Sequence, residues 1–388
     1  MKRTLFFFAV VSFALSALAT HCLAQTAPLP YGTLYGNLST FSSANCTGGG
    51  WVPGMQCATG TMQCDPSLYA DNLGFTIGYA TPASPTGTVV AFNGGNGTAP
   101  GSAVSHEVDT LQYYLANGLE VVQVAWNSPG WETSRISFPP DTYGNVLNAA
   151  CRPAGILHLV RNTPLLFPSG GAMCAQGFSA GSAAVAYTLS WYGAGWGPTG
   201  YIDNVELISG PIVSRFDEGC EVPVAPNINV CQGSPTCSFP PGGQPWSVTP
   251  EFVDNFENYP RTWSNIAACA NNSGGNTSIY NGAWYGMSIL NPNVTTQQLS
   301  FPSTSMHAWL CASVDGNVEP MNNSSSQGWL FYQQTSWKSA PTPLVNAVAN
   351  CDHPEGVYGT NATAYDGIPG HPIVLIEQDM FNNCRPHH

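Results

Sequence analysis

From Gly87 onward, short apolar segments alternate with segments of helical periodicity, and this alternation is the feature that most restricts the possible folds. The runs GTVVAF (Gly87–Phe92) and LEVVQVAW (Leu119–Trp126) are apolar and β-branched, as expected of strands buried on both faces. Between them, the apolar residues of SHEVDTLQYYLANG (105–118) recur at helical spacing and end at Gly118. The sequence therefore predicts an α/β fold with a mostly parallel central sheet and helices on both faces.

The same rhythm continues along the chain. A strand is expected at 171–178, followed at once by a helix at 180–193. Pro153 should bend or divide a helix at 145–162, because proline removes a backbone donor. The remaining expected elements are strands at 73–80, 205–212, 305–315 and 343–350, and helices at 327–337 and 372–381.

The first residues have the layout of a secretory signal. Lys2 and Arg3 precede an apolar run of about 15 residues and a small-residue cleavage region, and the run is short for a membrane span. Cleavage after Ala24 would remove Cys22 and leave 12 of the 13 cysteines, an even number that suits disulfide pairing. We therefore expect a secreted protein, extracellular or periplasmic, with disulfide bonds and no stable membrane span.

The chain divides into five predicted segments. They are a signal peptide (1–24), an N-terminal extension with early strands (25–86), the first part of the core (87–212), a disulfide-stapled insertion or lid (213–302), and the second part of the core (303–388).

The charge balance excludes some classes of partner. The 22 aspartate and glutamate residues outnumber the 9 lysines and arginines, which gives a formal net charge of −13. Such a surface repels nucleic acid and anionic membranes. No nucleic-acid partner is therefore expected.

One short motif contains a candidate catalytic residue. Gly177-Phe178-Ser179-Ala180-Gly181 forms a G-x-S-x-G pattern between the expected strand at 171–178 and the helix that follows. A strand that turns directly into a helix forces its corner residue into an unfavourable backbone conformation, and the flanking glycines avoid clashes there. Ser179 is thus a candidate nucleophile, and the N–H of Ala180 at the helix start can hold an oxyanion. The plain alternative is a glycine-rich loop that leads into a helix.

This motif in this setting resembles the α/β-hydrolase-fold serine hydrolases, of the secreted esterase or lipase kind, and the similarity runs from about Gly87 to the C-terminus except for the insertion. The resemblance implies an oxyanion loop after an earlier strand, and N-G-G-N-G (93–97) follows GTVVAF. Asn93 stands where many members have histidine. We expect Gly94 or Gly95 to supply the second N–H donor.

The resemblance also implies an acid and then a histidine, in that order along the chain. Asp315 follows the first strand after the insertion and is the expected acid, and His353 follows the last strand and is the expected base. The other acids in this region are Asp352, Asp366 and Glu319, and the other late histidines are His371, His387 and His388. The early histidines His106, His158 and His307 are expected to have local partners.

Two further expectations concern bonds and ions. As in some polyester-degrading relatives, a Cys311–Cys351 disulfide would brace the loops of Asp315 and His353. No metal-binding motif stands out, since His106-Glu107 lacks a second histidine four residues on and no C-x-x-C occurs. Neither a metal site nor a cofactor is therefore expected.

The predicted function is hydrolysis of a carboxylic ester, small or polymeric, through a Ser-His-Asp triad and an acyl-enzyme. A peptidase on the same fold is the second enzymatic interpretation. A non-catalytic binding protein on a hydrolase scaffold is the alternative of a different class, because a fold does not prove a function.

Overall fold

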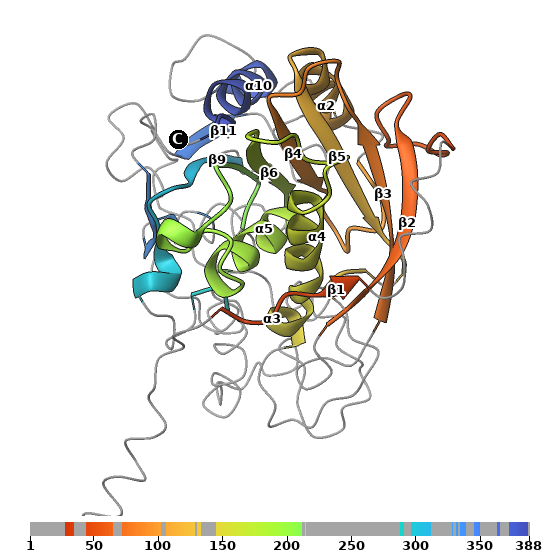
Figure 1. Cartoon of the computed structure of the whole chain (residues 1–388). Helices are drawn as coiled ribbons and strands as arrows, with labels where there is room; N and C mark the ends of the chain where they lie inside the picture. The colour runs from red at the N-terminus through yellow and green to blue at the C-terminus, as the bar shows by residue number, and fades with distance from the viewer. Residues whose placement is uncertain are drawn as a thin grey trace, which may run out of the picture.

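The computed structural model shows one large β-sheet with helices packed on both faces (Figure 1). It describes residues 28–34, 44–64, 72–101, 106–128, 130–132, 145–211, 214, 288–290, 296–311, 328, 331–332, 334–338, 345–349, 363–364 and 372–386. The predicted signal peptide and most of the predicted insertion lie outside these residues. No helix within the described ranges is long and apolar enough to cross a membrane.

In the described chain, ten strands form the main sheet in the order β1-β2-β3-β5-β4-β6-β7-β9-β11-β12. Their bounds are β1 (Thr33–Leu34), β2 (Gln56–Gln63), β3 (Asn72–Ala80), β4 (Gly87–Phe92), β5 (Leu119–Trp126), β6 (Ala172–Phe178), β7 (Asn204–Ile208), β9 (Ser305–Cys311), β11 (Val345–Ala349) and β12 (Thr363–Ala364). The six strands from β5 to β11 in this order are parallel. The flanking strands β1, β2, β3 and β12 pair antiparallel. The predicted, mostly parallel sheet is confirmed.

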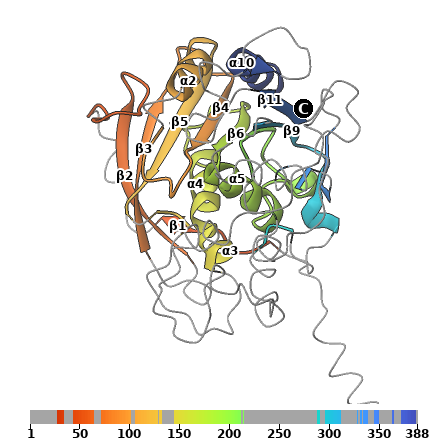
Figure 2. The ribbon, with the colours of Figure 1, turned by 180° about the vertical axis from the view of Figure 1, so that it is seen from behind.

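The two faces of the sheet carry different helices (Figures 1 and 2). Helices α2 (Glu107–Ala116) and α10 (Pro372–Asn383) pack together over one face, around a core that includes Leu111, Tyr114 and Met380. Helices α3 (Asn145–Ala149), α4 (Cys151–Arg161) and α5 (Ala180–Trp191) belong to the larger core on the other face. The helices on both faces explain why the central strands are apolar on both sides.

The central strands form where continuous apolar runs predict them. Every residue of β4, β5 and β6 is buried. The bounds of β4 and β5 match the predicted ranges, and β6 starts one residue later than expected. Phe92 pairs with Gly177, so the carboxyl ends of β4 and β6 lie level with each other. The loop after β4 and the turn after β6 are therefore neighbours.

The helix expected at 145–162 is divided, but not at the proline. The break falls at Ala150, between α3 and α4, and Pro153 occupies the first turn of α4. The first N–H groups of a helix have no intrahelical acceptor, so a proline costs little there. The predicted division is present, and its position is three residues earlier than the sequence suggested.

Two other elements differ from expectation. β7 ends at Ile208, four residues earlier than predicted, because Ser209 adopts a positive φ of 52° and leaves the strand. In the segment 327–337, the described residues Phe331 and Tyr332 are helical, but β10 (Ser336–Trp337) forms a short parallel pair with β8 (Ser300–Phe301). The predicted helix therefore gives way to a strand at its end.

Three disulfides join described residues. Cys46–Cys57 and Cys64–Cys151 fasten the N-terminal segment, and disulfide bonds of this kind are expected of a secreted chain. Cys174–Cys384 connects β6 to the residue after α10. The predicted pair Cys311–Cys351 involves side chains outside the described part of the chain, so this disulfide stays a prediction.

Candidate active site

Ser179 occupies the sharp corner between β6 and α5. Its φ of 54° and ψ of −116° lie in a region that residues other than glycine rarely adopt. The corner is held from both sides, because Ser179 N–H donates to the carbonyl of Ile208 (2.8 Å) and the Ser179 carbonyl accepts from the N–H of Ser182 (3.0 Å). Strain of this kind costs on the order of 1–3 kcal/mol and is concentrated at functional sites.

The glycines of the motif are required by contact. A Cβ at Gly177 would overlap the backbone of Gly181, and a Cβ at Gly181 would overlap the carbonyl of Phe92 at the end of β4. The strand end, the helix start and the neighbouring strand therefore meet with no room for a side chain. The strand–turn–helix geometry predicted from the sequence is present.

Ser182 reinforces the corner, a role that the sequence analysis missed. Its Oγ lies 2.6 Å from the carbonyl of Gly177 and 2.8 Å from that of Ile208. Ser182 is completely buried, so water cannot take the place of its hydroxyl as the hydrogen-bond partner of these two carbonyls. A hydroxyl three residues after the expected nucleophile, among the small apolar residues of the first turns of the helix, was the available signal.

The loop after β4 lies against the corner. A Cβ at Gly94 would approach the Phe178 ring to 2.9 Å and the Ser179 Cβ to 3.0 Å. Gly95, with a φ of 59°, has open space at its Cβ position. The residues predicted for the oxyanion loop are thus neighbours of the predicted nucleophile.

Asn93 shapes this loop in a way that bears on the donors. Its Oδ1 accepts from the Gly94 N–H at 2.7 Å, and its Nδ2 donates to the carbonyl of Ala99 at 3.4 Å. The Gly94 N–H is therefore engaged by the side chain that replaces the usual histidine. Ala180 is the first residue of α5, where N–H groups lack intrahelical acceptors.

A second loop supports the first. After β5, Trp126 N–H donates to the Gly97 carbonyl (2.9 Å) and Trp131 N–H donates to the Asn96 carbonyl (3.2 Å). Arg152, fully buried on α4, donates to the Trp131 carbonyl at 2.8 Å. Each of these bonds restrains the glycine-rich loop beside Ser179.

The predicted acid and base, Asp315 and His353, lie outside the described residues. The strands that lead toward them are described. β9 ends at Cys311 and β11 ends at Ala349, and both run parallel to β7 and β6. Parallel strands present their carboxyl ends at one edge of the sheet, which is also the edge of Ser179.

The early histidines have partners of two kinds. The Nδ1 of His106 lies 2.7 Å from Asp109 Oδ2, one turn along α2, and His158 stacks on Tyr31 and lies 3.2 Å from the Asn162 amide. His307 differs, because its ion-pair partner is Asp379, far along the chain on α10. The expectation of a local partner is therefore wrong for His307.

His307 and Asp379 belong to a second group of titratable side chains, together with Glu206. Burial and the nearby Asp379 carboxylate raise the pKa of Glu206 well above its usual range. Burial also acts to raise the pKa of Asp379, but hydrogen bonds from His307 and Glu206 outweigh it and lower that pKa to about 2. Among the described residues, these three side chains have the donor types and proximity to hold a metal ion. The signal in the sequence was a glutamate within an otherwise apolar strand.

Comparison with known proteins finds solved structures of low sequence identity, with TM-scores below 0.5. No protein-family model matches the sequence, and no curated protein matches it. Acetyl xylan esterase 1 from Thermoanaerobacterium is 12% identical, with 91% of this chain and 88% of that chain covered and a TM-score of 0.45. A bacterial heroin esterase is 13% identical, with 90% and 87% covered and a TM-score of 0.44.

A thermophilic carboxylesterase cloned from a metagenomic library is 14% identical, with 84% of this chain and 90% of that chain covered and a TM-score of 0.45. Independently of these likenesses, the strand order and the strand–turn–helix at Ser179 are those that the predicted α/β-hydrolase fold requires. The molecule has an α/β-hydrolase fold.

Proposed function

We propose that the protein is an exported serine hydrolase that cleaves carboxylic esters through an acyl-enzyme, with Ser179 as the nucleophile. The observation that carries this proposal is the strained corner at Ser179, held between β6 and α5 with the loop of Gly94 beside it. Unfavourable backbone angles are concentrated at functional sites, so the strain at this serine supports a catalytic role for its side chain. The three disulfides between described residues support export of the protein to an oxidising compartment.

In the proposed reaction, His353 takes the proton of the Ser179 hydroxyl while Oγ bonds to the acyl carbon. Asp315 orients the imidazole and stabilises its charged form. The N–H groups of Ala180 and of Gly94 or Gly95 hold the oxyanion. For Gly94 to act, the Asn93 side chain must first release its N–H.

The intermediate collapses in the ordinary way for this chemistry. The bond from the acyl carbon to the alcohol oxygen breaks, and the alcohol leaves with the proton carried by His353. Water then donates a proton to His353 and attacks the acyl-enzyme, and the acid leaves as the proton returns to Ser179 Oγ. Apart from the ester and the attacking water, every group in these steps belongs to the protein chain.

A fluorophosphonate probe tests the nucleophile directly. We expect the probe to label Ser179, as located by peptide mapping, and to abolish hydrolysis of short-chain aryl esters. The Ser179→Ala variant should lose labelling and at least about 10³-fold in kcat while it keeps its thermal unfolding midpoint, since triad members act as a unit.

The matched control is Ser190→Ala. Ser190 is also a buried serine of α5, and its Oγ has no hydrogen-bond partner in the described structure. This variant should keep both labelling and turnover. A folded wild-type protein that is neither labelled nor active would favour the binding-protein alternative, and faster cleavage of amides than of matched esters would favour a peptidase.

A further inference from the structure

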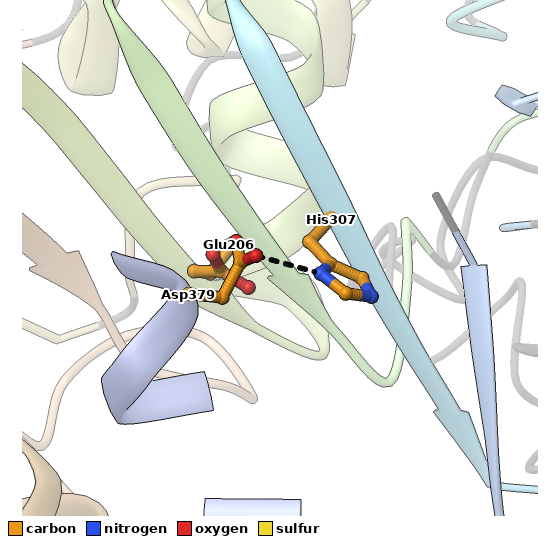
Figure 3. Close-up of side chains that lie close together, drawn as sticks. All are labelled: Glu206, His307 and Asp379. Carbon is orange, nitrogen blue, oxygen red and sulfur yellow. Dashed lines mark ion pairs between the residues drawn. The ribbon is translucent and has the colours of Figure 1, made fainter. Parts of the chain in front are cut away.

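Three chemically active side chains meet beneath α10, away from the strand ends that carry the proposed catalytic residues. Glu206 on β7 and His307 on β9 are direct register partners in adjacent strands, and Asp379 reaches them from α10 (Figure 3). One donor atom from each lies within 4.8 Å of the others. Figure 3 shows Asp379 and His307 facing each other. The Oδ1 atom of Asp379 and the Nδ1 atom of His307 are 3.2 Å apart.

The group is enclosed by protein. Glu206 has no exposed surface, and the side chains of His307 and Asp379 are only 9% and 13% exposed. Two carboxyl groups and one imidazole in such a place have an unfavourable charge balance unless a proton or a cation is shared among them. A divalent cation would balance both carboxylates at once.

A buried amide lies beside Glu206 and presents its nitrogen to that carboxyl group. Asn204 precedes Glu206 by two residues on β7, so both side chains point to the same face of the sheet. Its Nδ2 lies 3.3 Å from Glu206 Oε1 and 3.5 Å from the sulfur of Met380. Its Oδ1, in a fully buried residue, has no hydrogen-bond partner within the described part of the chain. An unsatisfied buried carbonyl of this kind requires an explanation.

The carboxylates also have the outer contacts that metal ligands typically have. Trp309 Nε1 donates to Glu206 Oε2 at 2.6 Å, and Asn383 Nδ2 donates to Asp379 Oδ1 at 3.0 Å. Trp309 in turn stacks on the His307 ring, with centroids 4.2 Å apart. Contacts of this kind fix the direction of ligating side chains.

We propose that Glu206, His307 and Asp379 form a binding site for one divalent transition-metal ion of the Zn²⁺ class, and that the Asn204 amide, whose nitrogen faces Glu206, turns its Oδ1 toward the ion as the fourth donor. One imidazole nitrogen with carboxylate oxygens suits Zn²⁺ better than Mg²⁺ or Ca²⁺, which prefer oxygen alone. Four protein donors make a closed, structural site. The ion would fasten α10 to β7 and β9.

Thermal unfolding of the chelator-treated full chain, with and without ZnCl₂, tests the site. We expect one Zn²⁺ per chain by elemental analysis after dialysis, and a rise in Tm of about 3–5 °C when free Zn²⁺ is 100 times its dissociation constant. MgCl₂ at the same concentration should give no rise. Binding should also release protons into unbuffered solution, because the ligands must be ionised.

Two variants assign the effect to this site. Glu206→Gln keeps the shape of a protonated glutamate and one of its two acceptor oxygens, so it should fold and lose the Zn²⁺ response. Glu377→Gln makes the same change elsewhere on α10, at another mostly buried position, and should respond as the wild type does. Asp379→Asn serves as a second ligand variant if Glu206→Gln does not fold.

Either of two results would overturn the site. One is a wild-type chain that gains neither stoichiometric Zn²⁺ nor a higher Tm. The other is an equal rise in Tm for the wild type and for a folded ligand variant, which would place the ion elsewhere.

Discussion

Single backbone positions control the geometry around Ser179. Gly94 and Gly95 are adjacent in sequence and chemically identical, but they differ in their surroundings. A side chain at Gly94 would press on Ser179 and Phe178, whereas one at Gly95 would enter open space. This difference separates a steric effect at the proposed oxyanion site from a general effect on the loop.

We expect Gly94→Ala to lower kcat for ester hydrolysis by about 10²-fold, the size expected when an oxyanion donor is displaced. The reason is that the new Cβ must move the loop away from the nucleophile. Steady-state kinetics with an aryl ester measure this loss, and circular dichroism shows that the fold is kept.

Gly95→Ala is the control for that experiment. Its φ of 59° makes alanine unfavourable by about 1 kcal/mol, so the variant should lose stability but keep most of its kcat. Equal kinetic losses for the two variants would contradict the proposed oxyanion loop, because strain alone would then explain both.

Among the elements, β5 contains a buried carboxyl group that should make stability depend on pH. Glu120 is 1% exposed, and its Oε1 has no hydrogen-bond partner in the described structure. Burial raises its pKa from 4.5 to about 7, although a hydrogen bond with Thr81 opposes the shift. The folded chain therefore keeps this proton at a pH where the unfolded chain has lost it.

The sign of the effect follows from that difference. Between about pH 4.5 and pH 7 the native state binds more protons at Glu120 than the unfolded state does, so stability falls as pH rises and levels off above pH 7. Glu120→Gln should reduce this fall, of which Glu377 contributes a further part, and should stabilise the protein at pH 8 by about 1–2 kcal/mol, with little change at pH 4. Urea unfolding across this pH range measures it.

Asp109→Asn is the control for the pH series, since it removes one negative charge at an exposed position. It should reduce only the part of the fall that Glu377 contributes, because burial and then the Asp109 carboxylate raise the pKa of Glu377, and it should leave the part due to Glu120 in place. If Glu120→Gln retains the wild-type slope, the side chain of Glu120 is hydrated in the folded protein and this explanation fails.

The elements also show what a sequence can predict. β4 and β5 were located correctly because each is a short, mainly apolar segment rich in valine, which is a local property. The break at Ala150 was displaced because the tolerance of Pro153 depends on where the helix begins. β10 was missed because a two-residue strand is defined by its partner β8 and not by its own residues.

At the scale of the molecule, the two groups of candidate functional residues show the same contrast between local and non-local features of the sequence. The strained corner at Ser179 could be predicted because its glycines, strand and helix are all adjacent in sequence. The group of Glu206, His307 and Asp379 was not found, because three elements far apart in the chain bring it together. Cysteine pairing is non-local too, and the Cys174–Cys384 link between β6 and α10 could not be deduced from the sequence.

That link should contribute more to stability than the Cys46–Cys57 disulfide does. Its cysteines are 210 residues apart, against 11 for Cys46–Cys57, and a longer closed loop restricts the unfolded chain more. The chain-entropy model gives about 5 kcal/mol for the long loop and about 3 kcal/mol for the short one. Paired alanine substitutions of each disulfide, compared by urea unfolding, should show this order.

Loss of the long link should affect stability far more than catalysis. Cys174 lies at the middle of β6, whereas the corner at Ser179 is held by bonds to Ile208 and Ser182 that the disulfide does not touch. We therefore expect kcat of the Cys174→Ala, Cys384→Ala protein to stay within about twofold of wild type at a temperature where it remains folded. A large loss of kcat without unfolding would mean that the position of α10 controls the corner at Ser179. The geometry at the carboxyl end of β6 would then depend on a helix that packs against another part of the sheet.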